Sequence, residues 1–369
     1  MSRGATQEGT KAYAAKFAGY AAQGHFREAQ GLTLSSLGAG TYLGQPDENK
    51  DAGYAAALVA AVENGINVID SAINYRFQRS ERSVGTAVKV LANKGFRREE
   101  VVVCTKGGYL TPEGTMPADP NRYFFEEYIQ RGIFTAKDIA GGSHCMTPRF
   151  LENQLGRSLK NLGVECVDIY YLHNPETQLS EIPKADFLKR VREAFVFLES
   201  AAARGRIQYY GMATWNGFRQ NASARDAMQL AEIAGLAKEI GGEQHRFRFV
   251  QLPYNLAMTE ALTLGNQTVG DSTKTMMEAA GELGITLIAS ASLLQGQVAQ
   301  NLPAFVAEAF GLENDVERAL QFARSSPGIA TALVGMSRVA HVEANAQLVR
   351  VAPAGIEQFN KLFSQGEGV

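Results

Sequence analysis

Short apolar runs alternate with longer segments of helical spacing along most of this chain. Runs such as 101–106 and 167–173 are apolar at nearly every position, which is typical of strands buried on both faces of a sheet. Each run is followed by a segment with the periodicity of a packed helix. The pattern gives eight strand–helix units, with strands at 36–42, 66–70, 101–106, 167–173, 207–214, 248–254, 285–290 and 329–335 and helices near 53–64, 80–93, 148–161, 186–204, 222–239, 272–283, 314–325 and 341–350.

Eight such units predict an α/β fold, a single (β/α)8 TIM barrel. An open, doubly wound sheet is the structural alternative, because a count made from sequence can miss one or two units. Thr147 and Pro148 have the residue types of a helix N-cap and first turn. Glycines follow predicted helices where a left-handed terminating residue is favoured, at Gly65, Gly95, Gly163, Gly205 and Gly284.

Two segments lie outside this alternation. Residues 1–30 form an N-terminal extension, which we expect to be helical, and residues 31–369 form the barrel. Residues 107–146 are inserted after the third strand and are too long for a structureless connection. Their aromatic residues indicate an ordered, partly buried loop, for which a substrate-side lid and a packing insertion are both open interpretations. These aromatics are Tyr109, Tyr123, Phe124, Phe125, Tyr128 and Phe134.

Composition narrows the class of partner. The chain has 369 residues, 45% of them hydrophobic and 20% charged, which excludes disorder and collagen as descriptions of the whole. Its 36 basic and 38 acidic residues give a net charge of −2, so neither nucleic acid nor an anionic membrane is expected as a partner. A small molecule is expected instead. The pattern does not indicate an oligomeric state.

The three cysteines, Cys104, Cys145 and Cys166, form no CxxC pair, and neither they nor the histidines have metal-ligand spacing. We therefore expect no metal site and a reducing compartment. The chain has no apolar run of 18 residues, and the charged first 19 residues do not resemble a signal peptide. The expected location is the cytoplasm.

Six consecutive strands end in polar residues, and the chemistry of TIM barrels gathers at the carboxyl ends of the strands. Each residue alone has an ordinary structural explanation, such as a turn cap or a satisfied core histidine. Together they predict one ring around one pocket. They are Asp70, Lys106, His173, Thr214, Gln251 and Ser290.

This ring permits carbonyl chemistry. Asp70 and Lys106 end neighbouring strands, so they can pair, and the pairing keeps the lysine charged. Tyr75 follows in the loop after Asp70, and we expect the ammonium to lower the pKa of its phenol. Tyr75 then acts as a general acid toward a carbonyl oxygen, to which His173 donates a hydrogen bond. No side chain supplies hydride, whereas a nicotinamide cofactor does.

The chain resembles the aldo-keto reductases from about Leu37 to Asn345. The family's LGxGT opening is 37–41 here, its DxAxxY signature is 70–75, and its TK strand end is 105–106. The DxxxLH stretch is 168–173, and Ser80, Glu81 and Gly85 follow the family pattern after the tyrosine. The resemblance implies the family's catalytic set, which is Asp70, Tyr75, Lys106 and His173.

The resemblance also implies a nicotinamide cofactor, with several departures from the family pattern. Ser290 replaces a tyrosine that stacks on the nicotinamide, Ser292 replaces a proline, and Arg76 replaces a glycine and is expected to reshape the pocket mouth. Ala213 lacks the hydroxyl of the family's serine. The implied cofactor residues are Gly40, Thr41, Tyr42, Asp70, Ala213, Thr214, Gln251, Ser290, Ser292, Leu293, Gly335, Ser337, Arg338, His341 and Asn345.

Ser337, Arg338 and the following helix start suit a 2′-phosphate, which favours NADP(H), with NAD(H) as the alternative. The function implied is an NADPH-dependent oxidoreductase that reduces an aldehyde or ketone to an alcohol, or the reverse. A non-catalytic nicotinamide-binding regulatory or sensor subunit on the same fold is a second hypothesis. A Schiff-base aldolase using Lys106 is a third, although pairing with Asp70 disfavours a nucleophilic lysine. The sequence does not indicate which carbonyl is the substrate.

Overall fold

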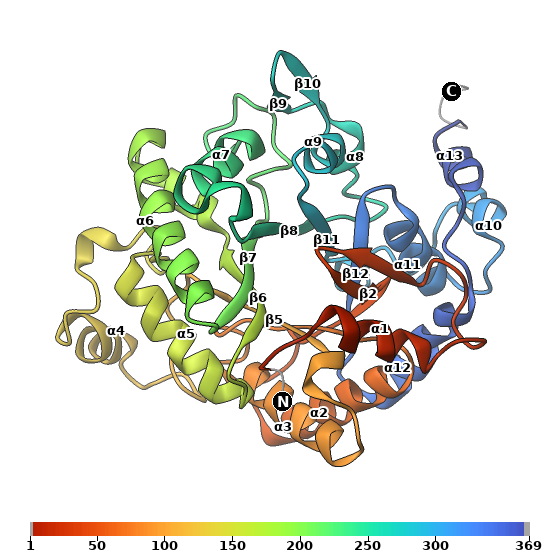
Figure 1. Cartoon of the computed structure of the whole chain (residues 1–369), viewed down its shortest axis with the longest axis horizontal. Helices are drawn as coiled ribbons and strands as arrows, with labels where there is room; N and C mark the ends of the chain where they lie inside the picture. Colours follow the sequence, from red (N-terminus) through yellow and green to blue (C-terminus); the bar gives the residue numbers. More distant parts are fainter. Residues whose placement is uncertain (1–2, 365–369) are drawn as a thin grey trace.

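The eight predicted strands pair side by side and close into a barrel in the computed structural model, which describes residues 3–364 (Figure 1). Every neighbouring pair is parallel, and closure occurs between the first and last strands of the series, so the TIM barrel is confirmed and the open sheet is excluded. The strands are β3 (Leu37–Gly40), β4 (Val68–Asp70), β5 (Val102–Gly107), β6 (Val167–His173), β7 (Ile207–Ala213), β8 (Phe247–Pro253), β11 (Thr286–Ser290) and β12 (Ile329–Gly335).

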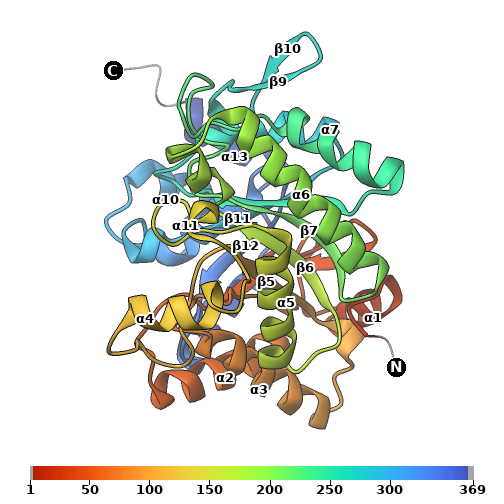
Figure 2. The same cartoon turned by 90° about the vertical axis from the view of Figure 1, so that its left-hand side faces the viewer.

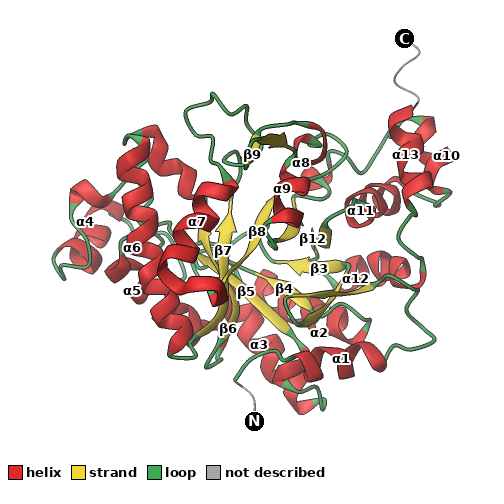
Figure 3. Cartoon of the chain, turned by 45° about the horizontal axis from the view of Figure 1, so that its top comes forward, coloured by secondary structure: helices red, strands yellow, loops and turns green. Residues whose placement is uncertain are grey.

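Helices surround this barrel, as Figure 3 shows. Those that follow the barrel strands are α2 (Glu48–Glu63), α3 (Arg79–Asn93), α5 (Pro148–Leu162), α6 (Lys184–Ala203), α7 (Leu230–Gly241), α9 (Met276–Glu282), α11 (Asp315–Ser325) and α12 (Val339–Asn345). The five glycines expected at helix ends all have positive φ, which only glycine adopts without strain. Outside the eight units lie α8 (Glu260–Thr263), α10 (Ala304–Phe310) and α13 (Ile356–Ser364). Within residues 3–364, no helix combines the length and apolar character needed to span a membrane.

Four predicted helices have different bounds, and one of them, α2, begins at Glu48 rather than near residue 53. The one expected at 272–283 begins only at Met276, because the Thr275 and Glu278 side chains form a capping box there. The preceding residues pair instead as an antiparallel hairpin of β9 (Gln267–Val269) and β10 (Ser272–Lys274). Residues 222–229 are irregular before α7, and α12 ends at Asn345 in a 3-10 turn.

The N-terminal extension, which was expected to be helical, contains the helix α1 (Gln7–Ala15). The chain then forms an antiparallel hairpin of β1 (Phe26–Ala29) and β2 (Leu32–Ser35). Leu32 and Leu34 are buried in one apolar cluster with barrel residues such as Val68. The hairpin therefore supplies apolar side chains to the barrel interior.

The insertion after β5 has an apolar cluster of its own. It contains α4 (Pro120–Phe124) and lies beside α5 in the views of Figures 1 and 2. Tyr128 and Phe134 stack with their ring centres 5.4 Å apart, and both contact Phe150 of α5. Cys145 is buried with them. The aromatics thus order this segment against α5.

Candidate active site

A buried ion pair lies at the carboxyl ends of β4 and β5. The Lys106 Nζ is 2.6 Å from the Asp70 Oδ2 and donates a second hydrogen bond of 2.8 Å to the Ser71 carbonyl. The other Asp70 oxygen accepts from the Gln251 amide at 2.8 Å. Lys106 and Asp70 are 1% and 4% exposed. The predicted pair is therefore present, with both carboxylate oxygens hydrogen-bonded.

Burial lowers the pKa of the Lys106 ammonium, but the nearby Asp70 carboxylate and the Tyr75 phenol outweigh burial, so the pKa is raised overall. Lys106 is consequently protonated at neutral pH. A protonated amine has no lone pair with which to attack a carbonyl carbon, so this environment does not favour Schiff-base chemistry.

Tyr75 lies between the ion pair and His173. The centre of the Tyr75 ring is 5.0 Å from the Lys106 Nζ and 5.7 Å from the centre of the His173 ring. Burial raises the pKa of Tyr75 above 10, and the Lys106 ammonium opposes this rise without cancelling it. The expectation of a lowered pKa is wrong, because the cost of burying a phenolate exceeds the attraction of an ammonium already paired with Asp70. Tyr75 therefore retains its proton at neutral pH.

His173 ends β6 as a neutral imidazole. Burial, with the Lys106 charge as the next cause, holds its pKa well below 6.5. Its Nδ1 is buried and has no partner among the described residues. Its carbonyl accepts a hydrogen bond of 2.8 Å from the Nε2 of buried His144. The structure thus brings all four predicted catalytic residues together at one end of the barrel.

Two further aromatic residues adjoin this group. The Tyr42 ring centre is 4.9 Å from that of Tyr75, and the Tyr109 ring centre is 5.2 Å from that of His173. The Tyr109 hydroxyl is hydrogen-bonded to Asn174 and Thr177. Sequence reasoning did not assign Tyr109 to the site, although its position three residues after Lys106 is a signal that could have found it.

The predicted cofactor positions lie on one rim of the barrel. Strand register pairs Gly40 with both Asp70 and Gly335, and Ala213 with both His173 and Gln251. Their places are Gly40, Thr41 and Tyr42 at and after β3, Asp70 on β4, Ala213 and Thr214 at β7, Gln251 on β8, Ser290, Ser292 and Leu293 at and after β11, Gly335, Ser337 and Arg338 at and after β12, and His341 and Asn345 on α12.

This rim has buried polar atoms without a partner among the described residues and open space beside one glycine. The Thr214 and Ser292 hydroxyls are buried without a partner among the described residues. A Cβ placed on Gly335 would contact nothing within 4 Å. In contrast, the Thr41 hydroxyl donates to the Asp70 carbonyl at 3.1 Å, and the Gln251 amide donates to the Asp70 carboxylate. Those two therefore help to hold the ion pair.

A family model described as the aldo/keto reductase family matches residues 36–301, which is most of the chain. The chain belongs to the aldo/keto reductase family. It is similar to the NADH-specific methylglyoxal reductase of Escherichia coli strain K12, with 29% identity over 188 residues. That match covers 49% of this chain and 49% of the relative, so the chain spans about half the length of this curated relative.

Solved structures of aldo-keto reductases share the fold. The holo form of an enzyme from Bacillus halodurans has a TM-score of 0.61 at 19% identity, over 92% of this chain and 95% of that one. A Klebsiella pneumoniae enzyme in complex with NADP and acetate has a TM-score of 0.61 at 18% identity, over 93% and 96%. At these identities the likeness concerns the fold.

This aldo/keto reductase has an unusual turn directly after Tyr75. Arg76, Phe77 and Gln78 are all left-handed, with φ of 47°, 57° and 71°. The conformation costs about 1–2 kcal/mol for each residue other than glycine, so other contacts must hold it. Arg76, which was expected to reshape the pocket mouth, has a buried side chain that pairs with Asp51 of α2.

A buried glutamate holds the loop after β7. The Glu176 Oε1 accepts hydrogen bonds from three successive backbone amides, those of Trp215, Asn216 and Gly217, at 2.7, 3.0 and 3.3 Å. This loop begins at Thr214, one of the predicted cofactor residues. Glu176 was missed because its partners are backbone groups, which no side-chain motif reveals.

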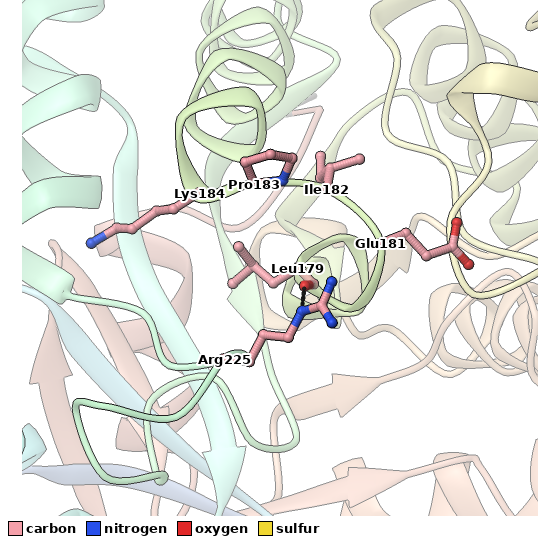
Figure 4. A pocket seen from close by; sticks show the side chains of 6 residues that line it. All are labelled: Leu179, Glu181, Ile182, Pro183, Lys184 and Arg225. Carbon is pink, nitrogen blue, oxygen red and sulfur yellow. Dashed lines mark hydrogen bonds between the residues drawn. The ribbon is translucent and has the colours of Figure 1, made fainter.

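A separate cavity of about 380 Å³ lies where α6 begins, and Figure 4 shows its lining. It includes Leu179, Ile182 and Pro183, together with Arg225, whose Nε donates to the Leu179 carbonyl. None of the four predicted catalytic residues lines it. The cavity is therefore distinct from the group that Asp70, Tyr75, Lys106 and His173 form.

Replacing Asp70 by Asn tests whether the ion pair is charged and buried. The change leaves the Lys106 ammonium buried without a counter-charge, so we expect the free energy of unfolding to fall by about 3–5 kcal/mol. The double variant Asp70→Asn/Lys106→Met removes both charges and recovers most of that loss. Urea unfolding followed by circular dichroism measures both values. A loss below about 1 kcal/mol, as for an exposed pair, would contradict the assignment.

Proposed function

We propose that this protein is an NADPH-dependent oxidoreductase that reduces an aldehyde or ketone to an alcohol, or catalyses the reverse reaction, with Tyr75 as general acid. The observation that carries the proposal is the buried set of Asp70, Lys106 and Tyr75 beside neutral His173. Membership of the aldo/keto reductase family supports the same reaction class.

A bound reduced nicotinamide supplies the hydride. Thr214 and Ser292 would hold the cofactor with their unpartnered hydroxyls, and Gly335 leaves room for it beside the strand end. Ser337 and exposed Arg338 would receive the adenosine end. The Klebsiella structure in complex with NADP supports this choice, whereas the Escherichia coli relative is NADH-specific. Arg338 leads us to favour NADP(H).

The mechanism follows from the protonation states of the site. The raised pKa of Tyr75 keeps its hydroxyl protonated, so it can donate the proton to a carbonyl oxygen that gains negative charge. Lys106 then stabilises the phenolate that remains, while Asp70 holds the ammonium in place. His173 donates a hydrogen bond from its neutral imidazole to the same carbonyl oxygen. In the reverse direction the phenolate accepts the proton of the alcohol.

Tyr75→Phe tests the general acid. The variant keeps the ring and loses the proton, so we expect kcat for carbonyl reduction to fall by about 10²–10⁴-fold. The dissociation constant for NADPH stays within about twofold, because the hydroxyl is not part of the proposed cofactor site. NADPH oxidation with a panel of aldehydes and ketones measures the first value, and fluorescence titration measures the second.

Tyr209→Phe is the matched control, since it removes a hydroxyl that bonds the Gln30 carbonyl in the N-terminal hairpin. Unchanged turnover in Tyr75→Phe would refute the role of Tyr75. Tight NADPH binding by the wild type without turnover of any carbonyl would favour the non-catalytic nicotinamide-binding hypothesis.

The pH dependence of carbonyl reduction follows from the two shifted groups. A general acid is lost as pH rises through its pKa, so the raised pKa of Tyr75 keeps kcat/KM level until about pH 10. Because the pKa of His173 is depressed, no histidine inflection is expected between about pH 5 and 8. Initial rates at saturating NADPH, with circular dichroism confirming the fold at each pH, measure this profile. An inflection near pH 6.5 would show that His173 titrates in the working range.

Arg338→Ala tests the choice of cofactor. A 2′-phosphate that meets this guanidinium loses a charge-assisted hydrogen bond, so we expect the dissociation constant for NADPH to rise about tenfold while that for NADH stays unchanged. Arg350→Ala removes an exposed arginine that packs on the Tyr20 ring and serves as the control. Equal effects on NADPH and NADH would contradict a phosphate contact at Arg338.

A further inference from the structure

The left-handed turn after Tyr75 is tied to its surroundings at each of its three residues. The Phe77 carbonyl accepts from the Gly114 amide at 2.8 Å, and the Gln78 amide group donates to the Pro112 carbonyl at 3.1 Å. Both partners belong to the insertion after β5. The side chain of Arg76 faces the other way, toward α2 and α3. A backbone that is unfavourable for each of its residues is thus held from two sides.

Arg76 uses all three of its guanidinium nitrogens. Its Nη1 is 2.8 Å from the Asp51 Oδ1, its Nε donates to the Ser80 hydroxyl at 3.0 Å, and its Nη2 donates to the Ser83 hydroxyl at 3.1 Å. The guanidinium carbon also lies 4.8 Å from the centre of the Tyr54 ring. A guanidinium hydrogen-bonded through all three nitrogens, which we call a guanidinium fork, fixes the direction of the side chain and therefore that of its backbone.

The same network reaches the catalytic group from a second direction. The Ser80 hydroxyl donates to the Thr41 carbonyl at 2.8 Å, and the Thr41 hydroxyl donates to the Asp70 carbonyl at 3.1 Å. Arg76 thus follows Tyr75 directly in the chain, and hydrogen bonds through Ser80 and Thr41 link it to Asp70. Its charge is paired with the Asp51 carboxylate, which Arg79 shares. Its influence on Tyr75 is therefore one of position.

We propose that Arg76 is a positioning residue for carbonyl reduction, holding the backbone after Tyr75 so that the phenol faces both Lys106 and the substrate oxygen. The proposal rests on the proposed role of Tyr75 as general acid. Arg76 stands where the family pattern has glycine, which would tolerate this backbone but could not fix it. In this chain the guanidinium fork thus fixes the backbone after Tyr75, which the conformation of the turn alone does not do.

The variant Arg76→Gly separates the positioning of Tyr75 from the strain of the left-handed backbone. Glycine relieves the left-handed strain, so the variant should fold, but it removes the whole network. We expect kcat, normalised to sites titrated with NADPH, to fall between about 10- and 100-fold, while the dissociation constant for NADPH changes less than about twofold. The primary isotope effect with NADPH deuterated at nicotinamide C4 should reach its full value, because the chemical step then limits turnover.

Two further variants sharpen the comparison. Arg76→Lys keeps the charge but loses the fork, so its kcat should lie between those of wild type and Arg76→Gly. Arg79→Lys is the matched control, since Arg79 pairs with the same Asp51 carboxylate at 2.6 Å but lies on α3 outside the left-handed run. Its kcat should match the wild type. Arg76→Lys also serves as the test if Arg76→Gly does not fold.

A double-mutant cycle with Tyr75→Phe decides between positioning and a purely structural role. If Arg76 acts through Tyr75, Arg76→Gly lowers kcat no further in the Tyr75→Phe background. A lower melting temperature with unchanged kcat per titrated site, or additive losses in the cycle, would overturn the proposal. Full turnover in Tyr75→Phe alone would instead refute the proposed function, so the two failures are distinguishable.

Discussion

The buried ion pair between Asp70 and Lys106 is the interaction on which the site depends. Removing two charges from water is costly, and the cost is recovered only where the geometry is close and the remaining hydrogen-bonding capacity is used. Here the contact is 2.6 Å, and Gln251 and the Ser71 carbonyl take up further bonds. Strands β4, β5 and β8 must therefore end at matching heights. The closed parallel barrel provides that register.

The pair also sets the protonation states around it. An ammonium held by Asp70 attracts a phenolate less than a free one would, so burial prevails and Tyr75 retains its proton. The same positive charge, together with burial, keeps His173 neutral. In the proposed reaction, the site would thus present two neutral donors to a substrate oxygen, with one cation behind them. This arrangement would favour negative charge that develops on that oxygen.

The barrel, and the meeting of Asp70, Lys106 and His173 at one end of it, could be predicted because they are local signals in the sequence: apolar runs and the polar residues that end them. The β9–β10 hairpin could not, because Ser272–Lys274 has too few residues to separate a strand from the first turn of a helix. The contacts of Glu176 and Arg76 could not be predicted for another reason. Their partners are backbone amides or residues on other elements, which proximity in sequence does not reveal. The prediction for the pKa of Tyr75 failed for a similar reason, since burial is a property of the assembled barrel.

In the proposed mechanism, the position of Tyr75 matters more than its acidity. A phenol whose pKa is raised is a weak acid, and it gives up its proton only to an oxygen that is becoming an alkoxide beside it. Such a transfer is effective only if the donor and the oxygen are aligned when charge develops. The chain accepts three left-handed residues directly after Tyr75 and binds the first of them with a full guanidinium fork. Strain at this turn is thus the cost of a fixed proton donor, and the ion pair receives the resulting phenolate.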